Sequence, residues 1–254
     1  MHRILWTGWL LAMKSLSLSS FFIVTSVVQP VLFATIAIYM FRTGVGAGSL
    51  LYAALGAGLL GIWSATLFGS GALLQWERWQ GTLELLVVAP ARFVLIVIPM
   101  TVATATLGIY SVAATLLWGR IFFGVPLDFA HPILFAVALA VTVVSVGLLG
   151  LLLASAFVVY RHASALANFL TYPVWLVAGL LVPVSTLPGW AEPLGWLLAP
   201  MWGGRAIRAA AFGGDPLPSI AVCFALGLAY LALAELCLRF FLRLARERAT
   251  LALA

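Results

Sequence analysis

Side chains that carry acid–base or metal chemistry are scarce in this sequence. Its 254 residues include seven acids and three histidines, and the histidines stand far apart along the chain. The two cysteines, Cys223 and Cys237, lie in one apolar run, where a helical rise of 1.5 Å per residue would separate them by about 21 Å. That distance is too long for a disulfide. The composition therefore argues against a clustered metal site and against an intrachain disulfide framework.

Lysine is almost absent as well. Lys14 is the one lysine of the chain, and it stands in GWLLAMKS at residues 8–15. This stretch is similar to a phosphate-binding loop, but Met13 replaces the second glycine and no strand precedes it. We therefore predict that the chain has no nucleotide site of its own. Because no carboxylate pair recurs at helical spacing within an apolar run, we also expect no catalytic, cofactor-binding or metal-binding residues.

Apolar side chains dominate instead. They make up 65% of the residues, and the mean hydropathy is +1.18. This composition predicts an all-α polytopic membrane protein, with residues 1–254 forming a single transmembrane domain. Residues 1–20 are imperfectly amphipathic and predict an interfacial helix, with a plain juxtamembrane tail as the alternative. Apolar runs, five of them free of charge and the last containing Glu235 and Arg239, predict six spans, at residues 21–41, 50–75, 93–118, 133–160, 163–182 and 219–242.

The basic residues at the span ends predict the orientation. With the N-terminus inside, the inner side holds Arg3, Lys14, Arg78, Arg92, Arg161, Arg239, Arg243, Arg246 and Arg248. The outer side then holds Arg42, Arg120, Arg205 and Arg208. Because cytoplasmic loops carry an excess of Lys and Arg, we expect both termini to be cytoplasmic.

A polar island at residues 75–92 separates the second and third predicted spans. Gly81 breaks the chain, Thr82 can cap the next turn and Pro90 cannot continue a helix, so a short helix is expected between them. Glu84 falls in its first turn, where the helix dipole favours a carboxylate. The leucines and valines around it leave the helix apolar nearly all round. Such a helix either lies in the lipid interface or inserts into a groove of a partner protein.

The segment 183–218 holds six of the twelve prolines and is too broken to cross a bilayer. We expect Pro193 in the first turn of a short helix that Pro200 stops, and a second helix at residues 202–212. A helical hairpin that dips partway into the membrane fits this pattern. A folded external loop with an ordinary aromatic belt is the alternative. The tryptophans suited to the headgroup level are Trp190, Trp196 and Trp202.

Glu235 is the one acid inside a predicted span, and Arg239 follows one helical turn later. This order suits an ion pair between residues i and i+4. Because the two residues lie near the cytoplasmic end of the span, we favour a structural pair. A gate or proton site is the alternative, since intramembrane carboxylates often serve as one.

Two motifs resemble those of the permease subunits of type-2 ABC transporters. The first is ERWQGTLELLVVAP at residues 77–90, and the second is PVSTLPGWAEPLGWLLAPMWGGRAIR at residues 183–208. The chain length, the six predicted spans and the predicted N-terminal interfacial helix agree with that family as well.

The resemblance implies how such a chain works and which residues take part. It implies a dimer with a second permease chain in the cell inner membrane, a homodimer in preference to a heterodimer. It also implies a separate cytoplasmic ATPase subunit in two copies that binds ATP and Mg²⁺. An ATPase-coupling region would comprise Glu77, Arg78, Gly81, Thr82, Leu83, Glu84, Leu86 and Pro90. An external re-entrant gate would comprise Pro183, Leu187, Pro188, Trp190, Pro200 and Arg208.

The expected function is export of a hydrophobic or amphipathic substrate, such as a drug, an antibiotic or a lipid-like molecule. Few charged residues fall along the predicted spans, which favours such a cargo. Export of a polysaccharide or a lipid-linked glycan is one alternative, because Trp63, Trp118 and Trp175 would suit a sugar path. A secondary transporter without an ATPase is another, with Glu235 as its coupling site. An intramembrane lipid-modifying enzyme is disfavoured, because clustered acids, bases and metal ligands are missing.

Overall fold

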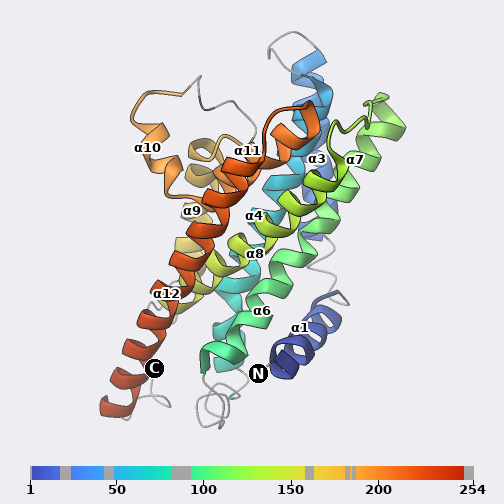
Figure 1. Cartoon of the computed structure of the whole chain (residues 1–254). Helices are drawn as coiled ribbons and strands as arrows, with labels where there is room; N and C mark the ends of the chain where they lie inside the picture. The colour runs from blue at the N-terminus through green and yellow to red at the C-terminus, as the bar shows by residue number, and fades with distance from the viewer. Residues whose placement is uncertain are drawn as a thin grey trace.

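The computed structural model describes residues 2–17, 24–42, 49–79, 81, 93–157, 163–180, 184 and 187–248, and no strand occurs among them. The elements (Figure 1) are α1 (His2–Ser17), a π-helical turn η1 (Val24–Val28), α3 (Gln29–Arg42), α4 (Leu50–Trp79), α6 (Phe93–Leu107), α7 (Ile109–Phe123), α8 (Pro132–Phe157), α9 (Ala163–Val177), α10 (Ala191–Trp196), α11 (Ala199–Phe212) and α12 (Leu217–Arg248).

The long helices form a bundle in which α4 runs opposite to α6 and α7. On α4, Gly69 lies against Thr104 of α6, whereas Gly58 lies against Val112 of α7, so α4 is antiparallel to both. The end of α4 and the start of α6 therefore share one end of the bundle. Figure 1 shows α1 and the end of α12 at this same end, and α10 at the other. We call the end that holds α1 the α1 end, and the end that holds α10 the hairpin end, because α10 and α11 form a helical hairpin there.

Helix α4 is the buried column of the bundle. In α4, 89% of the apolar window within Leu50–Ser70 is buried, compared with 22% for Leu217–Phe240 in α12. Glycines allow this close packing. A Cβ built on Gly58 would lie 2.8 Å from the Cα of Val112, and one built on Gly61 would lie 2.2 Å from the Cβ of Ser111. Small residues let helix backbones approach closely where lipid supplies no hydrophobic drive for association.

Four helical segments in the described part of the chain are long and apolar enough to cross a membrane. They are Leu50–Ser70, Val94–Phe123, Pro132–Ser155 and Leu217–Phe240. They fall on four of the six expected spans. The segment Val94–Phe123 falls on the third expected span, 93–118, and extends five residues beyond its expected end. The expected spans 21–41 and 163–182 overlap η1, α3 and α9, which are shorter, so their crossing stays a prediction.

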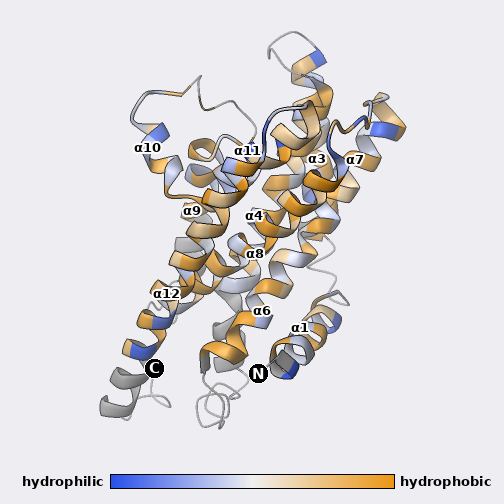
Figure 2. Cartoon of the chain, viewed as in Figure 1, coloured by the Kyte–Doolittle hydropathy of each residue, from blue (hydrophilic) through white to orange (hydrophobic). Residues whose placement is uncertain are grey.

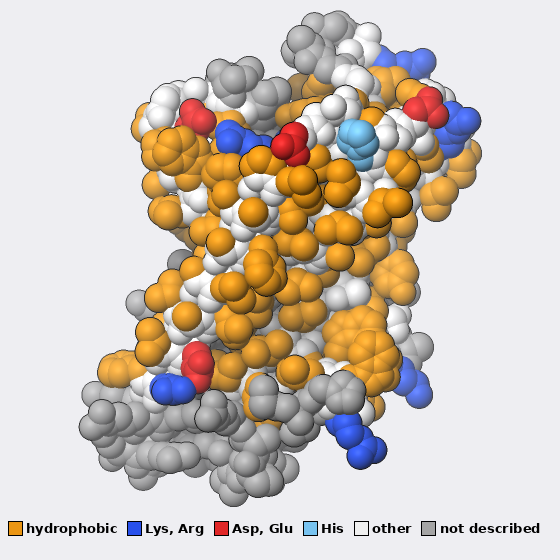
Figure 3. All heavy atoms as spheres, viewed as in Figure 1, with side chains coloured by type: hydrophobic (Ala, Val, Ile, Leu, Met, Phe, Trp, Pro, Cys, Tyr) orange, Lys and Arg blue, Asp and Glu red, His pale blue; other side chains and the backbone are white. Residues whose placement is uncertain are grey.

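Hydrophobic and charged residues separate along the bundle. Figure 2 shows hydrophobic residues through the middle of the long helices and hydrophilic ones towards the two ends. Figure 3 shows the same division on one face of the surface, where apolar side chains cover the middle of the molecule. A band of this kind is what a bilayer-embedded protein requires, because charged side chains are costly at the bilayer centre.

Two breaks interrupt the regular helices. Pro30 lies at the second position of α3, directly after the π-helical turn η1. The wider turn accommodates a ring that would otherwise clash with the carbonyl four residues earlier. Gly108 separates α6 from α7, and a Cβ there would lie 2.5 Å from the Cα of Ile62 on α4. The break at Gly108 divides the third predicted span, which was expected as one continuous helix.

Helix α1 packs against α6 at the α1 end. A Cβ on Gly8 would lie 2.9 Å from the Cγ of Pro99, and the indole Nε1 of Trp9 donates to the hydroxyl of Thr106 at 3.2 Å. Arg3 and Lys14 are exposed, away from these contacts. The structure therefore contains the expected N-terminal helix, whereas its position at a lipid interface stays a prediction.

Candidate functional site

The predicted coupling region begins at the α1 end of α4. Glu77 and Arg78 lie in the last turn of that helix. Gly81 follows, exposed and with a φ of +71°, a left-handed conformation that glycine adopts without strain. Thr82, Leu83, Glu84, Leu86 and Pro90 lie outside the described residues.

Helices α10 and α11 form a hairpin whose tip lies deep in the bundle. Helix α11 runs antiparallel to α8, because the carbonyl of Ala211 accepts from the N–H of Ala130 at 3.2 Å and Gly203 approaches Thr142. The tip, where α10 joins α11, contacts Tyr230. Tyr230 stands thirteen residues after Leu217 on α12, which corresponds to about 20 Å along the helix.

The residues of the predicted external gate fall into two groups. Leu187, Pro188 and Trp190 precede α10, and the latter two are exposed. Pro200 and Arg208 lie on α11, whereas Pro183 is outside the described residues. Our prediction that Pro200 stops the first short helix was wrong. Pro200 sits in the first turn of α11, where its missing N–H is tolerated and its fixed φ suits the helix.

The end of α9 presents backbone carbonyl groups that can accept hydrogen bonds from a cation. Gly179 has a φ of +64°, its N–H donates to the carbonyl of Leu176 at 3.0 Å, and the N–H of Leu180 donates to the carbonyl of Trp175 at 3.2 Å. This pair of hydrogen bonds is the Schellman motif that commonly ends a helix at glycine. It leaves the carbonyls of Gly179 and Leu180 without intrahelical partners, at the negative end of the helix dipole.

Arg208 of α11 occupies that place. Its Nη1 donates to the carbonyl of Gly179 at 2.9 Å, and its Nη2 donates to the carbonyl of Leu180. The guanidinium carbon lies 4.0 Å from the centroid of the Tyr52 ring, a cation–π contact. A Cβ on Gly56 would lie 2.2 Å from the Leu180 carbonyl oxygen, so α4 must carry glycine there. We call this meeting of α4, α9 and α11 the Arg208 junction.

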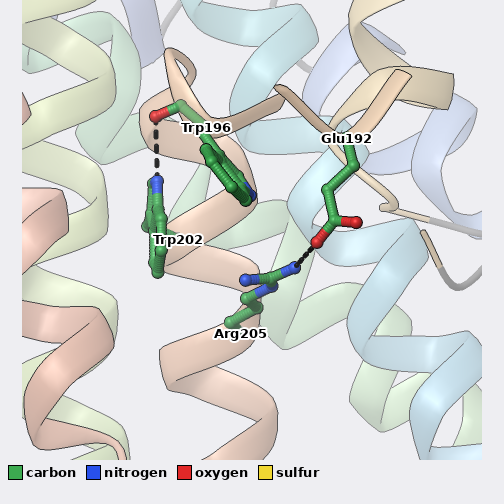
Figure 4. A network of polar contacts seen from close by, with 4 residues as sticks. All are labelled: Glu192, Trp196, Trp202 and Arg205. Carbon is green, nitrogen blue, oxygen red and sulfur yellow. Dashed lines mark hydrogen bonds and ion pairs between the residues drawn. The ribbon is translucent and has the colours of Figure 1, made fainter. Parts of the chain in front are cut away.

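A second polar group lies on the surface of the hairpin (Figure 4). Glu192 of α10 and Arg205 of α11 form an ion pair at 3.5 Å, and Arg205 lies over the ring of Trp202. The indole Nε1 of Trp202 donates to the carbonyl of Trp196 at 3.0 Å. The paired side chains are 50% and 40% exposed, so solvent screening leaves this pair at most about 1 kcal/mol.

A family model described as ABC-2 type transporter matches residues 5–212, which extend from α1 to the end of α11. The chain belongs to the ABC-2 type transporter family. The match confirms the resemblance to type-2 ABC permease subunits. The family is a membrane transport component that works with an ABC ATPase subunit. No curated protein matches the chain.

Glu235 and Arg239 of this permease form an ion pair on α12. The Arg239 side chain is well exposed and that of Glu235 about one third exposed, so the pair lies on the outer surface of the described bundle. This placement suits the structural pair that the spacing indicated. It lends no support to a buried proton site.

Tyr52 was not predicted from the sequence, and Gly56 was expected only as one of the small residues of the second predicted span that let a helix pack closely. Neither belongs to a motif, and their part in the Arg208 junction depends on which helix faces α11. A weak signal was present, because small residues recur along the second predicted span and indicate close helix packing there.

Replacement of Arg208 tests the junction. We expect Arg208→Met to lower the free energy of unfolding by about 1.5–3 kcal/mol, because two helix-end carbonyls lose charged donors. Unfolding in mixed micelles of increasing SDS content measures this loss. Arg205→Met is the matched control on the same helix and should change stability by about 1 kcal/mol or less. Equal effects of the two substitutions would contradict the junction.

Proposed function

We propose that this permease is the transmembrane subunit of an ATP-driven exporter of a hydrophobic or amphipathic substrate, such as a drug, an antibiotic or a lipid-like molecule. A separate ATPase subunit, in two copies, would dock at the coupling region 77–90 and hydrolyse ATP with Mg²⁺. The observation that carries this proposal is the continuity of α4 between the two regions that the resemblance marks as functional.

Helix α4 joins the coupling region to the outer hairpin without a break. Its 30 residues span roughly 45 Å. One end carries Glu77 and Arg78, whereas the other carries Tyr52 and Gly56 in the Arg208 junction. A close-packed buried helix transmits displacement because its neighbours leave it no room to bend. Movement at the α1 end would therefore reach the hairpin through α4.

The pathway would open by relative movement of two parts. The Arg208 junction ties α4, the end of α9 and α11 together, so these elements would move as one part. Helix α12 belongs to the other part, since it is the least buried of the four span helices. We propose that the hairpin enters the membrane from the outer side and closes the pathway between these parts.

The burial of the aromatic residues supports a hydrophobic cargo over a glycan. Trp63 and Trp175 are only 2% and 8% exposed, and Trp118 is half-buried with its Nε1 donating to Thr35 at 2.9 Å. These are the three tryptophans that would have suited a sugar path. Their side chains pack between helices, so they serve the core of the subunit and are not free to line a path.

The arrangement of the ends supports an inner-membrane protein with both termini cytoplasmic. Helix α1, the end of α4 and the end of α12 lie together at the α1 end (Figure 1). Arg3, Lys14, Arg78 and Arg239 lie on these elements, and this cluster of basic residues suits the cytoplasmic side. A cytosolic ATPase would then reach the coupling region.

The permease would act as a homodimer through α3 and α9. These helices are neighbours, since Phe33 of α3 packs edge-on against Trp175 of α9 with ring centroids 5.1 Å apart. Both helices present large exposed apolar side chains on their outer faces. They are Leu32, Ile36, Tyr39 and Met40 on α3, and Phe169, Tyr172 and Leu176 on α9. A second copy would cover this surface.

The coupling assignment is tested by Glu84→Arg combined with Leu86→Asp. We expect the double variant to lose co-purification with the ATPase and ATP-dependent accumulation of ethidium in inverted vesicles, because the charge at position 84 is reversed and a charged side chain replaces an apolar one at position 86 of the docking segment. Glu235→Gln, in the surface pair on α12, is the control and should retain both. Full association and transport by the double variant would refute the proposed coupling region.

The dimer surface is tested by cysteine cross-linking in a variant that lacks Cys223 and Cys237. Tyr172→Cys should give a covalent dimer under mild oxidation, because α9 would lie near the twofold axis. Phe224→Cys, at a comparably exposed position on α12, is the control and should stay monomeric. The reverse result, with cross-linking through α12 alone, would place the interface elsewhere.

A further inference from the structure

The tip of the hairpin leaves two backbone groups that its own side chains do not pair. Leu198 is the N-cap residue of α11 and makes no side-chain cap hydrogen bond, because an aliphatic side chain has no acceptor. The N–H groups of Leu197 and Leu198 donate back into α10, to Leu194 and Gly195. The N–H of Ala199 and the carbonyl of Leu197 remain to be paired.

Tyr230 of α12 pairs both groups with one hydroxyl. Its oxygen accepts from the N–H of Ala199 at 3.0 Å, and its O–H donates to the carbonyl of Leu197. The residue is 6% exposed. An aromatic residue on a different helix thus accepts from the first N–H of α11, one of the donors at a helix start that have no partner within the helix. Because a buried backbone group without a partner is costly in an apolar environment, the tip is bound to Tyr230.

Cys223 and Gly227, which lie near Tyr230 on α12, also bring this helix close to the hairpin tip and to α8. Cys223 lies on the same helix, α12. Its thiol sulfur is 3.7 Å from the carbonyl oxygen of Ala199, and the residue is fully buried. Gly227, between Cys223 and Tyr230 in the sequence, lets α12 approach α8, since a Cβ there would lie 2.8 Å from the hydroxyl oxygen of Ser145. The rest of α11 is held by α8 and by the Arg208 junction. The tip therefore contacts α12, whereas the remainder of α11 is held by α8 and by the Arg208 junction.

We propose that Tyr230 is the positioning residue that latches the hairpin tip to α12 and that this latch opens when the pathway opens. The inference rests on the proposed function of the hairpin as the outer gate. When α4 carries the Arg208 junction away from α12, the tip leaves the Tyr230 hydroxyl. Cys223 beneath the tip then meets water.

Cys223 serves as the reporter in a Cys237→Ser variant, because the chain has no third cysteine. The permease with its ATPase is placed in liposomes, and the rate at which a small methanethiosulfonate reagent modifies Cys223 is followed by mass spectrometry. Tyr230→Phe should raise the rate without nucleotide roughly 5- to 30-fold, the ratio expected for the loss of one or two buried hydrogen bonds. Tyr110→Phe, on the exposed side of α7, is the control and should leave the rate unchanged.

Dependence on nucleotide separates a latch from a merely structural contact. With Tyr230 present, ATP should accelerate modification of Cys223 several-fold, and in Tyr230→Phe this response should shrink towards none. A general loosening of the fold would raise the rate with and without ATP alike and preserve the response. A Tyr230→Phe rate equal to that of the Tyr110→Phe control, or an unchanged response to ATP, would overturn the latch.

Hydrogen exchange of the unsubstituted permease gives a second measurement that needs no variant to fold. The Ala199 amide should exchange at least about 5-fold faster with ATP than without, because its acceptor is lost. Equal exchange in the two states would overturn the latch. ATP-dependent ethidium transport, measured in parallel, would persist in that case, whereas failure of the proposed exporter would abolish transport itself.

Discussion

The charge of Arg208 is the constraint around which the hairpin end is arranged. A guanidinium inside an apolar bundle is costly unless its donors are satisfied. Here the acceptors are the two carbonyls that a glycine-ended helix cannot use, those of Gly179 and Leu180. Meeting this demand forces α9 to end beside α11 and requires a glycine, Gly56, on the facing side of α4. One cation therefore determines how three helices meet.

The same close packing gives α4 its place in the proposed mechanism. Residues that are small or glycine let α6, α7 and α8 approach α4 on several sides, which buries most of its apolar length. A helix enclosed in this way moves with its neighbours or not at all. Helix α12 has the opposite character, being mostly exposed, and touches the hairpin tip through Tyr230. The bundle thus contains an enclosed column, α4, and a peripheral helix, α12, and the hairpin contacts both, α4 at the Arg208 junction and α12 at Tyr230.

The positions of the long helices can be predicted from hydropathy, whereas the contacts between helices cannot. Long apolar runs predicted the long helices, and the helix expected at residues 202–212 ends where α11 ends, at Phe212. Pro200 was misassigned because a proline that stops one helix and one that starts the next look alike when the helices are two residues apart. The break at Gly108 depends on the backbone of α4 close by. Arg208 was marked only by family resemblance, and its acceptors are main-chain atoms that no side-chain pattern reveals.

The most direct test is whether α4 stays one rigid element through the transport cycle. Spin labels at Ser49→Cys and Arg78→Cys, in a variant without Cys223 and Cys237, bracket the helix. Mixed dimers with one labelled subunit then report the intrachain distance. The account predicts a distance of roughly 45 Å, the helical rise over this length, that is the same with and without ATP. A distance that changes by more than about one helical turn, 5.4 Å, between the two states would contradict transmission through α4.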